Sequence, residues 1–167
     1  KGIIYFKAFN KLEVIVGGLL RDRDLTLALA ESCTGGLIGH RITNVPGSSD
    51  YFRGSITAYA YDVKEALLGV SDALLEEHGA VSEPVAQQMA AGVRQMMKAD
   101  VGLSATGIAG PTGGTAGKPV GLVYVGLDAD DGAWVESHTF AEDRWGNKWR
   151  SADAALDLLR RYLEGGL

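Results

Sequence analysis

"LTLALAESCTGGLIGHRITNV" (residues 25–45) indicates the fold class most clearly. Its first six residues, 25–30, form a short apolar run bounded by turn signals, which predicts a buried strand. The segment from Thr34 to Val45 predicts a helix, with Thr34 as its N-cap. A buried strand followed directly by a helix is typical of an α/β protein.

The rest of the chain continues this alternation. Apolar periodicity and turn residues predict helices over 11–23, 62–69, 71–79, 82–99 and 145–163. Runs of β-forming residues predict strands over 55–61, 101–106, 119–129 and 133–140, the last two joined by a hairpin turn. The predicted fold is a single-domain α/β sandwich with a mixed β-sheet flanked by helices. Residues 1–10 are interpreted as a linker remnant or tag-like segment, and residues 11–167 as the domain.

Composition excludes several classes of function. The chain has 167 residues and a net charge of −5, and no run of Lys and Arg forms a stripe, which argues against binding to nucleic acid. A single cysteine rules out an internal disulfide. No apolar stretch reaches the length of a membrane span, and the first residues lack a signal-peptide layout. We therefore expect a cytoplasmic protein that does not bind membranes.

Three neighbouring side chains at the junction of the first strand and its helix are candidate nucleophiles: Ser32, Cys33 and Thr34. Backbone N–H groups at the start of a helix could stabilise an oxyanion there, and Gly35 and Gly36 allow a substrate to approach the backbone. The alternative is that Ser32 and Thr34 only cap the helix. Nothing near Cys33 indicates a lowered thiol pKa.

A serine nucleophile needs a base. The three histidines, His40, His78 and His138, are scattered and form neither a convincing triad nor a metal-ligand spacing. Lys64 begins the helix after the strand predicted at 55–61, and a lysine can act as a base when burial lowers its pKa. Tyr59 could relay a proton to it. The alternative is a solvated Lys64 and a Tyr59 packed in the core.

The glycine-rich segment "TGIAGPTGG" (106–114) follows another predicted buried strand. Loops of this kind present backbone N–H groups to anions, although this one has neither the P-loop nor the dinucleotide spacing. Thr106 lies at the strand end, where α/β folds place functional side chains. A purely structural turn is an equally good interpretation.

Several segments together resemble the C-terminal domain of the CinA proteins, the nicotinamide-nucleotide amidohydrolase family. The matching segments, which run from about Leu12 to Leu159 in the family's order, include "LALAESCTGG" (27–36), "ITAYAYDVK" (56–64), "TGIAGPTGG" (106–114) and "KPVGLVYVGL" (118–127). This resemblance implies hydrolysis of the carboxamide of nicotinamide mononucleotide to nicotinate mononucleotide and ammonia, without a metal or another cofactor. It also implies a homo-oligomer.

The resemblance assigns roles to residues of this chain. Ser32 becomes the nucleophile, Lys64 the general base, Tyr59 its partner, and Thr106 a hydroxyl beside the site. Substrate contacts are expected from Cys33, Thr34, Gly35, Gly36, Gly107, Gly110, Gly113 and Arg144. The chain departs from the family at Lys148, where the family usually has an arginine. A non-catalytic nucleotide-binding or regulatory module is the main alternative, and a DNA-binding competence factor is a third, disfavoured by the negative charge.

Overall fold

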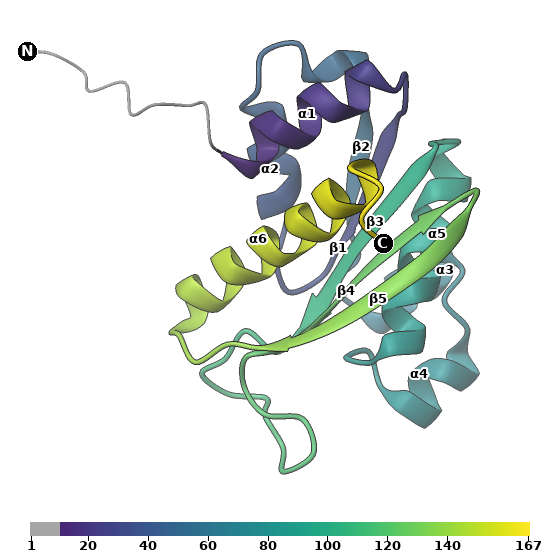
Figure 1. Cartoon of the computed structure of the whole chain (residues 1–167). Helices are drawn as coiled ribbons and strands as arrows, with labels where there is room; N and C mark the ends of the chain where they lie inside the picture. Colours follow the sequence, from purple (N-terminus) through teal and green to yellow (C-terminus); the bar gives the residue numbers. More distant parts are fainter. Residues whose placement is uncertain (1–10) are drawn as a thin grey trace, which may run out of the picture.

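The computed structural model describes residues 11–167, so the interpretation of residues 1–10 lies outside the described residues. Five strands form one mixed sheet in the order β2-β1-β3-β4-β5 (Figure 1). The three strands β1 (Leu27–Glu31), β2 (Phe52–Thr57) and β3 (Val101–Gly107) run parallel. The remaining two, β4 (Leu122–Ala129) and β5 (Gly132–Thr139), are antiparallel and form the predicted hairpin, with Ala129 paired to Gly132.

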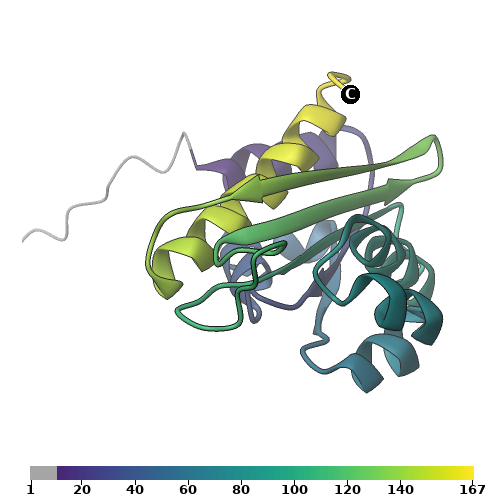
Figure 2. The same ribbon diagram turned by 90° about the horizontal axis from the view of Figure 1, so that it is seen from below.

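Helices cover both faces of this sheet. On one face lie α1 (Leu12–Asp22), α2 (Leu37–Thr43) and α6 (Arg144–Leu163). On the other lie α3 (Tyr61–Leu68), α4 (Asp72–His78) and α5 (Glu83–Met97). A short 3₁₀ helix, Ser48–Asp50, precedes β2. Figure 2 shows the two helical layers above and below the sheet. The predicted α/β sandwich with a mixed sheet is therefore confirmed.

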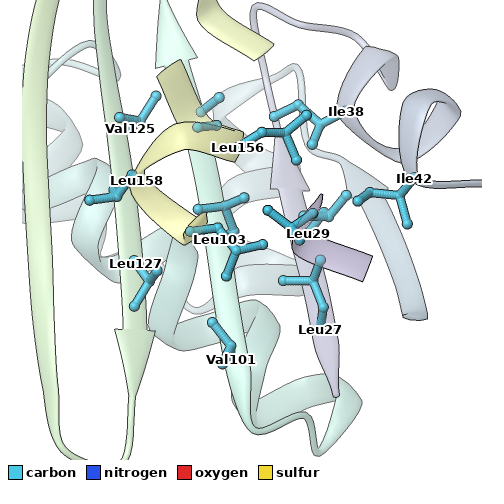
Figure 3. Packing of buried hydrophobic residues seen from close by; sticks show 14 of the residues in the cluster. Leu27, Leu29, Ile38, Ile42, Val101, Leu103, Val125, Leu127, Leu156 and Leu158 are labelled. Carbon is cyan, nitrogen blue, oxygen red and sulfur yellow. The ribbon is translucent and has the colours of Figure 1, made fainter. Parts of the chain in front are cut away.

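Alternate residues of the central strands supply two separate cores. In Figure 3, Leu29 of β1 lies near Ile38 of α2 and Leu156 of α6, and Leu158 of α6 lies beside Leu127 of β4, all within one core. The intervening residues of β1, Ala28 and Ala30, point to the other face, where α5 covers them. Because both faces of β1 are buried, the strand reads as a continuous apolar run rather than an alternating one.

Several predicted boundaries are wrong by three or four residues, and two of these corrections concern the candidate site. The strand predicted at 55–61 ends at Thr57, because residues 58–60 leave the sheet and lead into α3. The predicted helix N-cap, Thr34, is also wrong, since α2 begins at Leu37 after Gly36. Gly35 and Gly36 both have positive φ, a conformation that glycine adopts without steric cost and that delays the start of the helix.

Candidate active site

The site lies where two neighbouring parallel strands end. Ser32 directly follows β1, and Thr106 is near the end of β3, which pairs with β1 up to Glu31 and Ala105. The backbone N–H of Ser32 donates to the carbonyl of Ala105 at 2.9 Å, which fixes Ser32 at this edge of the sheet. The carboxyl ends of parallel strands are where open α/β sheets bind ligands.

Lys64 of α3 contacts Ser32. Its Nζ lies 3.2 Å from Ser32 Oγ, although the two residues are 32 positions apart in sequence. The Lys64 side chain is almost completely buried, and the structure places no acidic side chain of residues 11–167 in an ion pair with it. Burial lowers the pKa of Lys64, because a charged amine loses hydration in the interior. Lys64 is therefore not the solvated helix residue of the alternative interpretation.

Two main-chain carbonyls hold the amine in place. Lys64 Nζ donates to Ala58 O at 2.8 Å and to Tyr59 O at 3.0 Å. These carbonyls are available because residues 58–60 have left the sheet and no longer bond to β1. With two directions occupied by carbonyls, the third direction of the Lys64 amine faces Ser32 Oγ. A neutral amine in this position presents its lone pair to the Ser32 hydroxyl.

The structure separates the three candidate nucleophiles. Burial raises the pKa of the Cys33 thiol to about 12, so the thiolate is not available near neutral pH. Thr34 is fully buried, and its hydroxyl donates to Glu31 Oε2 at 2.7 Å rather than facing a substrate. Ser32 alone of the three contacts a candidate base.

Two backbone N–H groups lie directly beside Ser32, those of Cys33 and Thr34. Among residues 11–167, the N–H groups of Cys33 and Thr34 donate to no backbone or side-chain oxygen, although both residues are buried. Buried N–H groups are nearly always paired in folded proteins. Unpaired N–H groups next to a serine hydroxyl are the arrangement that stabilises an oxyanion.

A pocket of about 230 Å³ brings most of the predicted site residues together. Its lining includes Ser32, Cys33, Lys64 and Thr106, with Arg144 from the first turn of α6. A neighbouring hollow of about 680 Å³ shares Ala109 and Arg144 with it and also contains Lys148. A ligand larger than one aromatic ring could therefore extend from the first space into the second.

Tyr59 and Arg144 meet across the mouth of the pocket. Arg144 Nη2 donates to the Tyr59 hydroxyl at 3.3 Å, and Arg144 Nη1 donates to Gly110 O at 2.6 Å. Tyr59 is 61% exposed, so it is not the core aromatic of the alternative interpretation. The hydroxyl of Tyr59 bonds to Arg144, whereas its main-chain carbonyl is the part that bonds to Lys64.

The remaining predicted residues take different positions. Thr106 lines the pocket, but its hydroxyl donates to Ala80 O at 2.8 Å. Gly107 lines the pocket as well. In the described part of the chain, Gly35, Gly36 and Gly113 do not line it, and Gly110 contributes only the carbonyl that holds Arg144.

Sequence reasoning missed one residue, Glu31. It is fully buried at the end of β1, and its carboxylate accepts hydrogen bonds from backbone N–H groups at the start of α2 and from the hydroxyls of Thr34 and Ser55. The available signal was its position as the last residue of an otherwise wholly apolar strand, next to the candidate nucleophile.

Catalysis by histidine or by a bound metal has less support than catalysis by the Ser32–Lys64 pair. None of the three histidines lines the Ser32 pocket. Residues 11–167 contain no group of three or more His, Cys, Asp or Glu side chains placed to hold a metal ion. In the same residues, no helix combines the length and apolar character needed to cross a membrane.

The fold and this site define the chain as an α/β domain with a buried serine–lysine pair at the carboxyl edge of a mixed sheet. Residues 9–163 match the family model of the CinA C-terminal domain. The chain belongs to this family.

Similar proteins agree with this assignment. A CinA-like protein of Salinibacter ruber is 57% identical over 152 residues, covering 91% of this chain and 37% of that protein. A CinA-like protein of Geobacter sulfurreducens is 50% identical over 161 residues, covering 96% of this chain and 39% of that protein. The chain thus spans less than two fifths of the length of these curated relatives.

Solved structures match the fold closely. The crystal structure of the competence/damage inducible protein CihA from Agrobacterium tumefaciens has a TM-score of 0.87 and 34% identity, and the match covers 95% of this chain and 99% of that one. A CinA superfamily protein from Escherichia coli gives a TM-score of 0.85 and 29% identity, with 95% of each chain covered.

Proposed function

We propose that this domain hydrolyses the carboxamide of nicotinamide mononucleotide, producing nicotinate mononucleotide and ammonia. The observation that carries the proposal is the 3.2 Å contact between Lys64 Nζ and Ser32 Oγ, with Lys64 buried and its pKa lowered. Membership of the CinA family supports it through the resemblance noted from the sequence.

The first half of the reaction forms an acyl-enzyme. Ser32 Oγ attacks the carboxamide carbon while its proton passes to the neutral amine of Lys64. The negative charge on the carboxamide oxygen is stabilised by the N–H groups of Cys33 and Thr34, which bond to no oxygen among residues 11–167. Lys64 then gives its proton to the departing nitrogen, the C–N bond breaks, and ammonia leaves.

The second half reverses these proton transfers. Water attacks the ester carbon, and Lys64 accepts the proton of that water. The C–Oγ bond then breaks, Lys64 returns a proton to Ser32 Oγ, and the product leaves as the acid, which loses its remaining proton to water or to ammonia to give the nicotinate carboxylate. The two carbonyls of Ala58 and Tyr59 keep the Lys64 amine oriented through both halves.

The size and charge of the neighbouring space favour a mononucleotide over free nicotinamide. The pocket of about 230 Å³ suits the aromatic ring, and the adjoining hollow of about 680 Å³ suits the ribose and phosphate. Arg144 and Lys148 supply positive charge there, beside the carboxylates of Glu142 and Asp143, of which Asp143 accepts the N–H of Gly146 at the start of α6. We expect these two basic side chains to contact the phosphate.

The test compares turnover with binding. The chain is incubated separately with nicotinamide mononucleotide and with nicotinamide, and ammonia is measured by a coupled assay. The proposal predicts release from the nucleotide and at least about tenfold less from nicotinamide, which lacks the phosphate. Calorimetric binding of the nucleotide by folded protein without ammonia release would instead indicate the alternative function, a non-catalytic nucleotide-binding or regulatory module. Assembly as a homo-oligomer stays a prediction.

A further inference from the structure

The carboxylate of Glu31 joins the two ends of the loop that carries Ser32. Oε2 accepts from Gly36 N at 3.1 Å and Ile38 N at 3.0 Å, and Oε1 accepts from Gly39 N at 2.8 Å. Glu31 itself immediately precedes Ser32 in the chain. Residues 32–35 are therefore enclosed between the backbone of Glu31 and the amides that its own side chain binds.

Two hydroxyls complete this set of contacts. Thr34 Oγ1, from inside the loop, donates to Oε2 at 2.7 Å, and Ser55 Oγ, from β2, donates to Oε1 at 3.1 Å. All five partners are donors, which matches the acceptor-only character of an ionised carboxylate. Within residues 11–167, Glu31 forms no salt bridge, so backbone amides, hydroxyls and the positive end of α2 take the place of a cation.

The loop depends on such contacts because its own conformation is weakly determined. Gly35 and Gly36 have φ values of +62° and +93°, and glycine has more conformational freedom than any other residue. The close approach of α2 also favours Gly39, since a Cβ there would lie 3.1 Å from Ser55 Cβ, closer than most contacts of this kind. The helix start and the loop are thus built around the carboxylate.

The same contacts define which N–H groups remain free. Glu31 occupies the amides of Gly36, Ile38 and Gly39, so these cannot bind a substrate anion. The N–H groups of Cys33 and Thr34 bond to no oxygen among the described residues. The carboxylate therefore engages the amides that hold the loop and leaves those of Cys33 and Thr34 outside its hydrogen bonds.

We infer that Glu31 is a positioning residue for catalysis: it fixes the loop 32–36 so that Ser32 Oγ meets Lys64 and the N–H groups of Cys33 and Thr34 stay available. It acts through the loop and touches neither Lys64 nor the substrate. The inference rests on the proposed function for its kinetic consequence, whereas its structural part, that the carboxylate orders the loop, is independent of the substrate.

The test uses Glu31→Gln in the full chain, with Glu13→Gln as the matched control. The substituted amide keeps the size of the Glu31 side chain, but only one of its two polar atoms can accept hydrogen bonds. Glu13 is another buried carboxylate, paired with Arg41 at 2.8 Å and placed on α1 outside the pocket. Hydrogen exchange of the segment 32–39 is measured together with kcat and KM for nicotinamide mononucleotide.

We expect Glu31→Gln to speed exchange of residues 32–39 by at least about tenfold, because local opening becomes easier. We expect kcat to fall about 10²-fold with KM changed less than about threefold, since a misplaced nucleophile weakens the transition state more than binding. Glu13→Gln should lower the melting temperature while leaving exchange of this segment and kcat within about twofold of the unsubstituted chain.

Several results would overturn the inference. One is unchanged exchange of residues 32–39 in Glu31→Gln, and another is a loss of kcat equal to that of Glu13→Gln. If the unsubstituted chain releases no ammonia, the proposed function fails, yet the exchange measurement still decides whether Glu31 orders the loop.

Should Glu31→Gln not fold, Thr34→Val removes one donor to the same carboxylate. We expect it to lower kcat about tenfold, and unchanged exchange and kcat in that variant would contradict the inference.

Discussion

The Nζ atom of Lys64 lies 3.2 Å from the Oγ atom of Ser32, and the same nitrogen donates to the carbonyls of Ala58 and Tyr59. A lysine side chain that is 1% exposed is expensive to bury as a cation. This lysine faces a serine hydroxyl in a pocket, and its burial supports the proposed role of Lys64 as a base.

Replacing the amine tests this role directly. Lys64→Met keeps the shape of the side chain but removes the base, and we expect kcat to fall by about 10³-fold. The free energy of unfolding should change by less than about 2 kcal/mol, because two effects oppose each other. The variant loses the hydrogen bonds to Ala58 and Tyr59, which destabilises it, but it no longer buries an amine, which stabilises it. Ammonia release and urea denaturation measure the two quantities. More than a tenth of the original kcat in folded Lys64→Met would rule out Lys64 as the base.

The pH dependence of activity follows from the lowered pKa of Lys64. The neutral amine is the active form, so kcat/KM should rise with pH and reach half of its maximum below 10.5, the ordinary lysine value. A rate that decreases steadily from about pH 6 to about pH 9, with the protein still folded, would contradict this assignment.

Stability has a related pH dependence with a definite sign. Because the folded-state pKa of Lys64 is lowered, the unfolded chain binds more protons between that pKa and 10.5, and stability gains with rising pH across this window. Below the window, the cost of protonating buried Lys64 is fully present. Lys64→Met removes this contribution, so its stability relative to the unsubstituted chain should decline as pH rises through the window. Parallel stability curves for the two proteins would show that Lys64 does not titrate in this way.

Tyr59→Phe distinguishes the hydroxyl of Tyr59 from its main chain. The hydroxyl contacts Arg144, and only the carbonyl contacts Lys64. We therefore expect kcat to change by less than about threefold, with any larger effect appearing in KM through Arg144. The two steady-state constants are measured over a full range of nicotinamide mononucleotide concentrations. A kcat loss comparable with that of Lys64→Met would show that the hydroxyl takes part in proton transfer.

The single cysteine should be inert in the folded protein. Cys33 is 5% exposed, and burial raises its pKa to about 12. We expect Ellman's reagent to label it at about pH 8 only after denaturation, since the thiolate is the reacting form. Rapid labelling of the native protein would reopen Cys33 as a candidate nucleophile.

Much of this arrangement could be predicted from the sequence, because the patterns involved are local. The continuous apolar run at 25–30 identified a strand buried on both faces, and the turn at Asp130 and Asp131 marked the hairpin. The serine and the lysine could each be singled out by their positions at strand and helix ends. Their pairing depends on a contact between distant segments, which only the family resemblance suggested.

The errors arose where tertiary contacts overrode local preference. Thr34 is a good N-cap residue by type, but Glu31 reaches across the loop and binds the helix amides instead. Residues 58–60 continue the alternating pattern of the strand before them, but the carbonyls of Ala58 and Tyr59 bond to Lys64 instead of to the sheet. An acidic residue at the end of a strand is usually solvated, so nothing local distinguished Glu31 as a buried acceptor of five hydrogen bonds.

The decisive experiment follows formation of nicotinate mononucleotide by anion-exchange chromatography, for the unsubstituted chain and for Ser32→Ala at equal protein concentration. The unsubstituted chain should form this product in equal amount to the ammonia released, and Ser32→Ala should form it at least about 10³-fold more slowly while keeping its circular dichroism spectrum. Product formation by Ser32→Ala at the original rate, or none by the folded unsubstituted chain, would contradict the assignment of Ser32 and Lys64 as the catalytic pair of an amidohydrolase.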